Sequence, residues 1–267
     1  MNKEQVETTN TPLVKPGDKV AALNLTVSEG KRLIALGIAH HPVVQKKMRS
    51  GMIIITKGTT NTYIAEELAD MDAPRGSFMT GNITPVSKGE IDKGLEKRPE
   101  VILINGVVSD ISYTDALKKL SKDDIVLKGG NMLNYERKQA AVCIGAPDGG
   151  TTYKLMPYVG EGKAQLIIPI GLEKEVHGDL LTYEQILDQS IEKLNYIPRV
   201  HVFKEGVLFT EIEAIKQFGD VQVFPFASGG IAGREGGISL VISGTEAEVQ
   251  KILDVVKEIQ GELPFVD

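Results

Sequence analysis

The stretch IIITKGTTNTYIAEEL, residues 53–68, decides the fold class. Its first three residues are isoleucines, which favour a strand buried on both faces. The residues KGTTNT at 57–62 are mostly small, hydroxylated or amide-bearing and predict a loop, and the remainder predicts a helix. A buried strand that leads through a loop into a helix is the repeating unit of α/β proteins.

The same order of strand, loop and helix recurs after Gly51. We expect strands at residues 52–56, 101–106, 124–129, 140–146 and 164–171, and helices at 60–69, 112–120, 151–162 and 181–194. These strands are continuous apolar runs, as is typical of a parallel sheet covered by helices on both faces. The sequence therefore predicts an α/β fold with a mostly parallel sheet. Residues 75–94, rich in Gly and Pro, predict short strands or a long loop.

Several helix starts are marked by a Thr followed three residues later by Glu or Gln, the spacing of a capping box. The pairs are Thr26 with Glu29, Thr182 with Gln185, Thr210 with Glu213 and Thr245 with Glu248. Pro42 is expected to divide the segment after Thr26 into two helices, because proline disrupts a helix interior. Gly261 is expected to end the last helix.

The order of expected strands and helices changes near residue 198. A strand at 199–203, a helix at 210–219, two strands at 221–227 and 238–244 and a helix at 245–261 give the order β-α-β-β-α. This order predicts a C-terminal ferredoxin-like α+β unit. We therefore expect an N-terminal arm at 1–20, an α/β ligand-binding domain at 21–197 and a ferredoxin-like domain at 198–267.

Composition narrows the class of protein. The 267 residues carry a net charge of −6 and no Trp, which argues against a nucleic-acid partner. The apolar runs are far shorter than the roughly 20 residues that span a bilayer, and the N-terminus does not resemble a signal peptide. Cys143 is the single cysteine, so no disulfide forms within the chain. We expect a cytoplasmic protein with no membrane partner that forms a homo-oligomer.

Three glycine-bearing loops each follow an expected strand of the large domain: residues 57–62, 128–134 and 145–152. Ligands collect at the carboxyl ends of strands in open parallel sheets, where backbone N–H groups and helix N-termini bind anions. The alternative is that each glycine only permits a tight turn. No loop has the spacing of a Walker motif or of a dinucleotide fingerprint.

The residues that we expect to bind a small anion are those of the three loops with free backbone, hydroxyl, amide or ammonium groups. They are Lys57, Gly58, Thr59, Thr60, Asn61, Gly129, Gly130, Asn131, Gly149, Gly150 and Thr151. Lys128 and Asp148 are the candidates for catalysis, although Asp148 is equally suited to capping the next helix. The segment 227–241 is either a flap that brings Arg234 to the anion or a hairpin end.

The histidines and the carboxylates expected near the carboxyl edge are weaker candidates for a functional site. The adjacent His40 and His41 lack metal-ligand spacing, so no metal site is expected, and Cys143 reads as a small hydrophobic residue. His177 is a weak acid–base candidate on the same rim. The carboxylates expected near the rim are Asp110, Glu136, Asp148, Glu173 and Asp179.

The order of IIITKGTTNTYIAEEL, DDIVLKGGNMLN and AAVCIGAPDGGTT resembles the superfamily of ribose-5-phosphate isomerase, glucosamine-6-phosphate deaminase and the CoA transferases. The resemblance implies that Gly58, Thr59 and Thr60 form a phosphate loop and that residues 125–131 form the second strand of the site. Gly129, Gly130 and Asn131 stand where the isomerase carries Asp residues, and no position matches the Glu nucleophile of the CoA transferases.

Three functions remain open from the sequence. The first is binding of a small phosphorylated or carboxylated metabolite (a sugar phosphate, a nucleotide or a CoA-like compound), with isomerase- or transferase-type chemistry. The second is a non-catalytic metabolite sensor with the same pocket. The third is an oligomeric assembly protein whose loops bind nothing. The sequence leaves the ligand, any cofactor and the existence of a reaction undecided.

Overall fold

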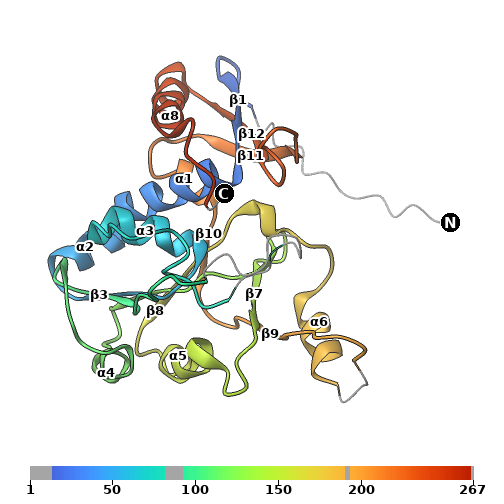
Figure 1. The fold of residues 1–267 in the computed structure, drawn as a ribbon. Helices are drawn as coiled ribbons and strands as arrows, with labels where there is room; N and C mark the ends of the chain where they lie inside the picture. The colour runs from blue at the N-terminus through green and yellow to red at the C-terminus, as the bar shows by residue number, and fades with distance from the viewer. Residues whose placement is uncertain (1–13, 82–83, 85–92, 190–192, 266–267) are drawn as a thin grey trace.

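The computed structural model describes residues 14–81, 84, 93–189 and 193–265 and is built around a six-stranded sheet (Figure 1). The strands lie in the order β10 (Val207–Phe209), β8 (Gln165–Pro169), β5 (Ile125–Leu127), β2 (Met52–Ile55), β3 (Val101–Ile104) and β4 (Val107–Val108). The first four are parallel, whereas β3 and β4 are antiparallel to their neighbours. The predicted α/β class with a mostly parallel sheet is confirmed.

Helices cover both faces of this sheet (Figure 1). On one face lie α1 (Val27–His40), α2 (Pro42–Arg49) and α3 (Thr59–Ala69), and on the other lie α4 (Tyr113–Lys119) and α5 (Gly150–Gly160). All four residues of β2 are buried, because helices pack on both of its sides. The short helix α7 (Glu211–Ile215) follows β10 and packs against α1.

Most of the predicted helix boundaries are confirmed. Thr26 and Thr210 form complete capping boxes, Thr245 caps α8 (Glu246–Ile259), and Pro42 separates α1 from α2. The prediction for Thr182 is wrong, because α6 (Leu180–Asp188) begins earlier. Its cap is the Asp179 carboxylate, which accepts a hydrogen bond from the backbone N–H of Leu181 at 3.0 Å.

A separate antiparallel sheet consists of β6 (Met132–Asn134), β7 (Gln139–Ile144) and β9 (Arg199–Val202), with α6 packed against β9. The strand expected at 140–146 therefore does not belong to the parallel sheet. The reason is the turn at Tyr135–Lys138, which folds β7 back onto β6. Lys138 occupies the left-handed region of this turn, with a φ of 54°.

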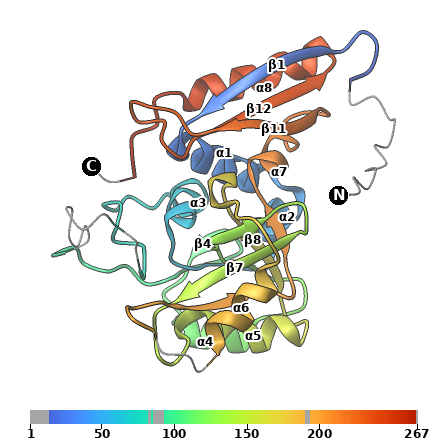
Figure 2. The same cartoon turned by 90° about the vertical axis from the view of Figure 1, so that its right-hand side faces the viewer.

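A third sheet lies above α1 in Figure 2 and joins the two ends of the chain. Its strands are β1 (Lys19–Leu25), β12 (Ile238–Gly244) and β11 (Gln222–Ser228), all antiparallel, and α8 packs on β1 and β12. The strand β1 was not predicted. The ferredoxin-like unit is not confirmed, because β9, β10 and the β11–β12 hairpin lie in three different sheets. The domain boundary near residue 198 stays a prediction.

An ion-pair network fixes the C-terminal segment against α1 and α3. The Arg32 guanidinium contacts Glu66, Glu67 and Glu262, and Arg75 also contacts Glu66 and Glu262. The five side chains are largely buried and share partners, so fixing the conformation of one restricts the others. This network sets the position of α3 relative to α1.

Close packing of α1 on α7 requires Gly37. A Cβ atom there would lie 2.6 Å from the Cα of Ala214. We predict that Gly37→Ala lowers the free energy of unfolding by about 1–2 kcal/mol, because overpacking outweighs the gain of about 1 kcal/mol in helix propensity. Urea denaturation measures the change. The matched control is Gly160→Ala in α5, where nothing lies within 4 Å and stability should not fall. Equal effects of the two substitutions would contradict the prediction.

Candidate functional site

The parallel pairing of β2 with β5 places the loops that follow them side by side. The backbone N–H of Thr56 donates to the carbonyl of Leu127 at 3.1 Å, and the Thr56 hydroxyl donates to the same oxygen at 3.0 Å. Lys57 and Lys128, the first residues of the two predicted loops, therefore follow adjacent strand ends. Two of the three glycine-bearing loops meet at the carboxyl edge of the main sheet, where parallel sheets bind ligands.

Asn61 holds these two strand ends together. Its side-chain Nδ2 donates to the carbonyls of Thr56 and Leu127 at 2.8 and 3.0 Å. Its Oδ1 is buried and has no hydrogen-bond partner among the described residues. Asn61 was predicted as a ligand contact, and the structure places its amide group in the brace that positions the loop.

The N-terminus of α3 lies at this edge and is uncapped. Gly58 precedes the helix, offers no capping side chain and has open space where a Cβ would stand. The N–H groups of the first helical turn have no intrahelical acceptor, and together they carry roughly half a positive charge. The hydroxyls of Thr59 and Thr60 have no hydrogen-bond partner within the described part of the chain. Backbone and side-chain donors are thus available at this helix end.

Lys128 lies beside this helix end. Ile55 pairs with Leu127 in parallel register and the N–H of Thr56 donates to the Leu127 carbonyl, so Thr56 and Lys128, the next residues of the two chains, are neighbours. Neighbours in register point to the same face of a sheet. Asn61 of α3 contacts the Thr56 hydroxyl at 3.4 Å and the Leu127 carbonyl at 3.0 Å, so the N-terminus of α3 lies next to the residue that precedes Lys128.

Lys128 is a largely buried residue whose ammonium group makes no ion pair with the described residues. Lys128 is 8% exposed, and no carboxylate of the described residues lies within 4.0 Å of its Nζ. Burial lowers the pKa of Lys128 to about 8, and the charge of Glu100 only partly opposes that shift. Glu100 is shared, since it also lies 3.8 Å from the Nζ of Lys57. At the ends of β2 and β5, two lysines therefore share one carboxylate.

The glycines after β5 have a packing role. A Cβ on Gly129 would lie 3.3 Å from the carbonyl oxygen of Pro169, and one on Gly130 would lie 2.8 Å from that of Ala141. The Asn131 Oδ1 accepts a hydrogen bond from the N–H of Cys143 at 2.9 Å. These three predicted anion contacts let the chain pass close to β8 and β7 and fix its path.

The third loop follows β7 and so does not end on the main sheet. The Asp148 carboxylate accepts a hydrogen bond from the N–H of Gly150 at 2.9 Å, which is the capping role considered for it. Gly149 and Gly150 have φ values of 80° and 53°, which glycine tolerates. The Thr151 carbonyl accepts a hydrogen bond from the hydroxyl of Tyr113, the first residue of α4. Burial and, second, the charge of Glu100 raise the pKa of Tyr113.

Arg234 lies in the turn between β11 and β12. Its guanidinium donates to the carbonyl of Gly229 and to the side chains of Ser239 and Asn24. These contacts hold the hairpin end in shape. An anion contact by Arg234 stays a prediction.

A second cluster at the same edge was not predicted as a site, although Glu173 was placed on the rim. Glu173 follows β8, Glu211 follows β10, and Lys31 comes from α1. Burial, together with the charge of Glu173, raises the pKa of Glu211 to about 8. The Glu211 Oε2 accepts a hydrogen bond from the N–H of Leu172 at 2.9 Å. Burial lowers the pKa of Lys31, which the charge of Glu173 partly opposes.

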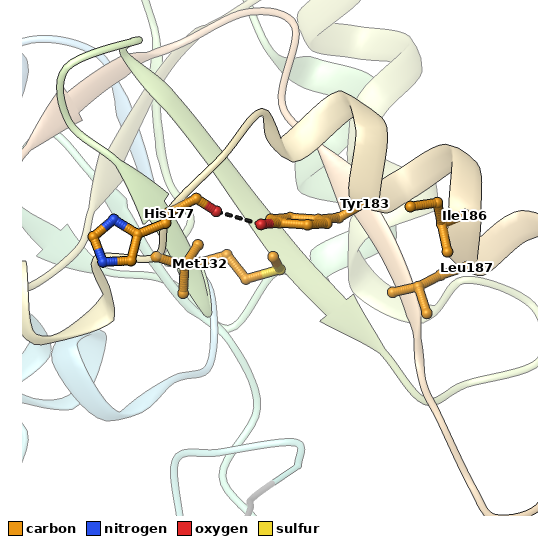
Figure 3. Close-up of a pocket in the computed structure, with 6 residues that line it drawn as sticks. Met132, His177, Tyr183, Ile186 and Leu187 are labelled. Atoms are coloured by element: carbon orange, nitrogen blue, oxygen red, sulfur yellow. Dashed lines mark hydrogen bonds between the residues drawn. The ribbon is translucent and has the colours of Figure 1, made fainter. Parts of the chain in front are cut away.

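His177 lies away from this edge, in an open apolar groove of about 520 Å³ (Figure 3). Figure 3 shows Tyr183, Ile186 and Leu187 of α6 along the groove and the Tyr183 hydroxyl bonded to the carbonyl of His177. His41 caps α2 through its Nδ1, and burial raises the pKa of the half-buried Cys143. Within the described ranges, no group of three His, Cys, Asp or Glu residues is placed to hold a metal ion.

Comparisons with protein-family models, curated proteins and solved structures find no match to this chain. None of the helices in the described part of the chain is both long enough and apolar enough to cross a membrane. Function is therefore inferred from the geometry of the carboxyl edge.

An unpaired buried ammonium destabilises the fold, and this gives a test of Lys128. The folded protein releases this proton near pH 8 and the unfolded chain near 10.5, so the penalty is full below pH 8 and disappears as pH rises toward 10.5. We predict that Lys128→Met raises the free energy of unfolding at pH 7 by on the order of 2 kcal/mol in phosphate-free buffer. Urea denaturation at pH 7 measures it, with the exposed Lys122→Met as the control without effect. A less stable Met variant would contradict the assignment.

Glu211 predicts a pH dependence of the opposite sign. Its folded pKa lies above the ordinary value of 4.5, so the stability that it contributes is present below pH 4.5 and is lost as pH rises toward 8. The charged groups that act on it are Glu173 and Lys31. We predict that Glu211→Gln gains stability relative to the parent protein between pH 5 and 8. Parallel stability curves for the two proteins over this range would contradict the raised pKa.

Proposed function

We propose that this protein binds a small phosphorylated or carboxylated metabolite at the carboxyl edge of its main sheet. The observation that supports this most directly is the position of Lys128. Lys128 is buried beside the N-terminus of α3, and within the described ranges the one carboxylate that acts on its ammonium group, Glu100, is shared with Lys57. An anion at this point supplies the missing negative charge.

The chemistry of the surrounding groups fits a phosphate or carboxylate. The first turn of α3 offers N–H donors, Thr59 and Thr60 offer hydroxyl donors, and Lys128 and Lys57 offer charge. Anions are favoured at helix N-termini, and hydrogen bonds to a charged acceptor are roughly twice as strong as neutral ones. The open space at Gly58 lets a ligand approach the backbone.

The resemblance to the ribose-5-phosphate isomerase and CoA-transferase superfamily is part of this proposal. It rests on the order of the loops at 57–62 and 128–134, which share one sheet edge. The reaction type carried by that superfamily, the cytoplasmic location and a homo-oligomeric state are proposed with it. Lys128 is the residue that we propose for proton transfer, since a pKa of about 8 lets it exchange a proton near neutral pH.

Thermal unfolding with added anions tests the binding proposal. Phosphate, sulfate and citrate are compared with sodium chloride at equal ionic strength. A ligand at 100 times its dissociation constant adds about 2.7 kcal/mol, which raises the melting temperature by several degrees. We expect at least one of these anions to stabilise the protein and Lys128→Met to abolish the shift, while Lys122→Met retains it. No stabilisation by any anion, or an equal shift in the Lys128 variant, would overturn the proposal.

A further inference from the structure

The cluster of Glu173, Glu211 and Lys31 contains a buried oxygen that accepts no hydrogen bond from the described chain. It is the Glu173 Oε1, whose one charged neighbour within 4.0 Å among the described residues is the Nζ of Lys174 at 3.8 Å. Lys31 is 6% exposed and makes no ion pair within 4.0 Å among the described residues, although both carboxyl groups act on its charge, and its Nζ lies 5.9 Å from the centroid of the Phe265 ring. Buried polar groups are normally hydrogen-bonded, so the Glu173 oxygen needs an explanation.

Glycines make room for this arrangement. A Cβ on Gly171 would lie 1.8 Å from the Oε2 of Glu173, so the carboxylate folds back over the end of β8. A Cβ on Gly30 would lie 2.7 Å from the Oε1 of Glu211. Gly171 has a φ of −75°, which any residue adopts, so its absent side chain matters for space rather than for backbone conformation.

The strands that lead into Glu173 and Glu211 lie one and two positions from β5, the strand that ends at Lys128. β8 pairs directly with β5, and the carbonyl of Ile167 accepts a hydrogen bond from the N–H of Lys128 at 3.1 Å. Neighbouring strands are about 4.8 Å apart, so the ends of β8 and β10 lie on the order of 5 and 10 Å from the end of β5. Lys31 belongs to α1, which covers the same face of the sheet as α3 (Figure 1).

We propose that Glu173, Glu211 and Lys31 form a second subsite, which binds the hydroxyl or carbonyl group of a small metabolite whose anionic group lies at Lys128. The Glu173 carboxylate accepts a hydrogen bond from a hydroxyl group, and Lys31 donates one to a hydroxyl or carbonyl oxygen. The substrate class is thus a short hydroxylated phosphate ester or carboxylate. This inference rests on the proposed anion site.

Calorimetric titration with two matched pairs of compounds tests the subsite. Propyl phosphate is compared with glycerol 3-phosphate, and propionate with lactate, so that each pair differs only in hydroxyl groups. In at least one pair the hydroxylated member should bind about ten-fold or more tightly, as expected for hydrogen bonds to charged groups. Glu173→Gln and Lys31→Met should reduce this preference to less than about two-fold.

Two further variants separate the subsites. Lys128→Met should weaken both members of a pair equally, and Glu136→Gln, at an exposed position in the β6–β7 turn, should change neither. Gln replaces the Glu173 carboxylate with almost no change of shape, and circular dichroism checks the fold of each variant. Equal affinity within both pairs in the parent protein overturns the second subsite alone. No binding of any of the four compounds overturns the anion site and the subsite together.

Discussion

The carboxyl edge of the main sheet is organised around one uncompensated charge, the ammonium group of Lys128. Lys128 is buried at the end of β5, next to the strand end that leads into the N-terminus of α3, and Glu100, the one carboxylate of the described residues that acts on it, also lies 3.8 Å from the Nζ of Lys57. Burial of an unpaired charge costs free energy, and that cost is largest where the neighbouring dipole has the same sign. A fold that keeps such a group has a use for it, and a bound anion is the simplest.

The packing around this edge explains how the charge is held there. Asn61 ties the ends of β2 and β5 together, and Gly129 and Gly130 let the chain pass against neighbouring carbonyl groups. The network of Arg32, Arg75 and Glu262 fixes α3 against α1 at a distance from the edge. Asn61 and the two glycines therefore position the strand ends, and Lys128 is the group that we propose contacts the ligand.

The sequence predicts those parts of the molecule that depend on local pattern. The run of isoleucines at 53–55 identifies a central strand, because a strand that helices cover on both faces is apolar at every position. The run at 140–146 is equally apolar, yet it belongs to another sheet, because an apolar run does not specify its pairing partner. β1 was missed because its partner, β12, lies more than 200 residues away. Lys128 was identified by its place after a strand, whereas Lys31 and Glu211 come close enough for their charges to interact only when α1 packs on α7.

The pKa of Lys128, measured by NMR titration of ¹³Cε-labelled lysine and assigned with the Lys128→Met spectrum, tests the central claim most directly. In phosphate-free buffer we predict a midpoint near 8, and in saturating phosphate a midpoint that moves upward, because a bound anion stabilises the ammonium form. A titration midpoint of Lys128 at the ordinary value of 10.5 in both buffers would contradict this account, because the ammonium group would then be neither buried nor lacking a counter-charge.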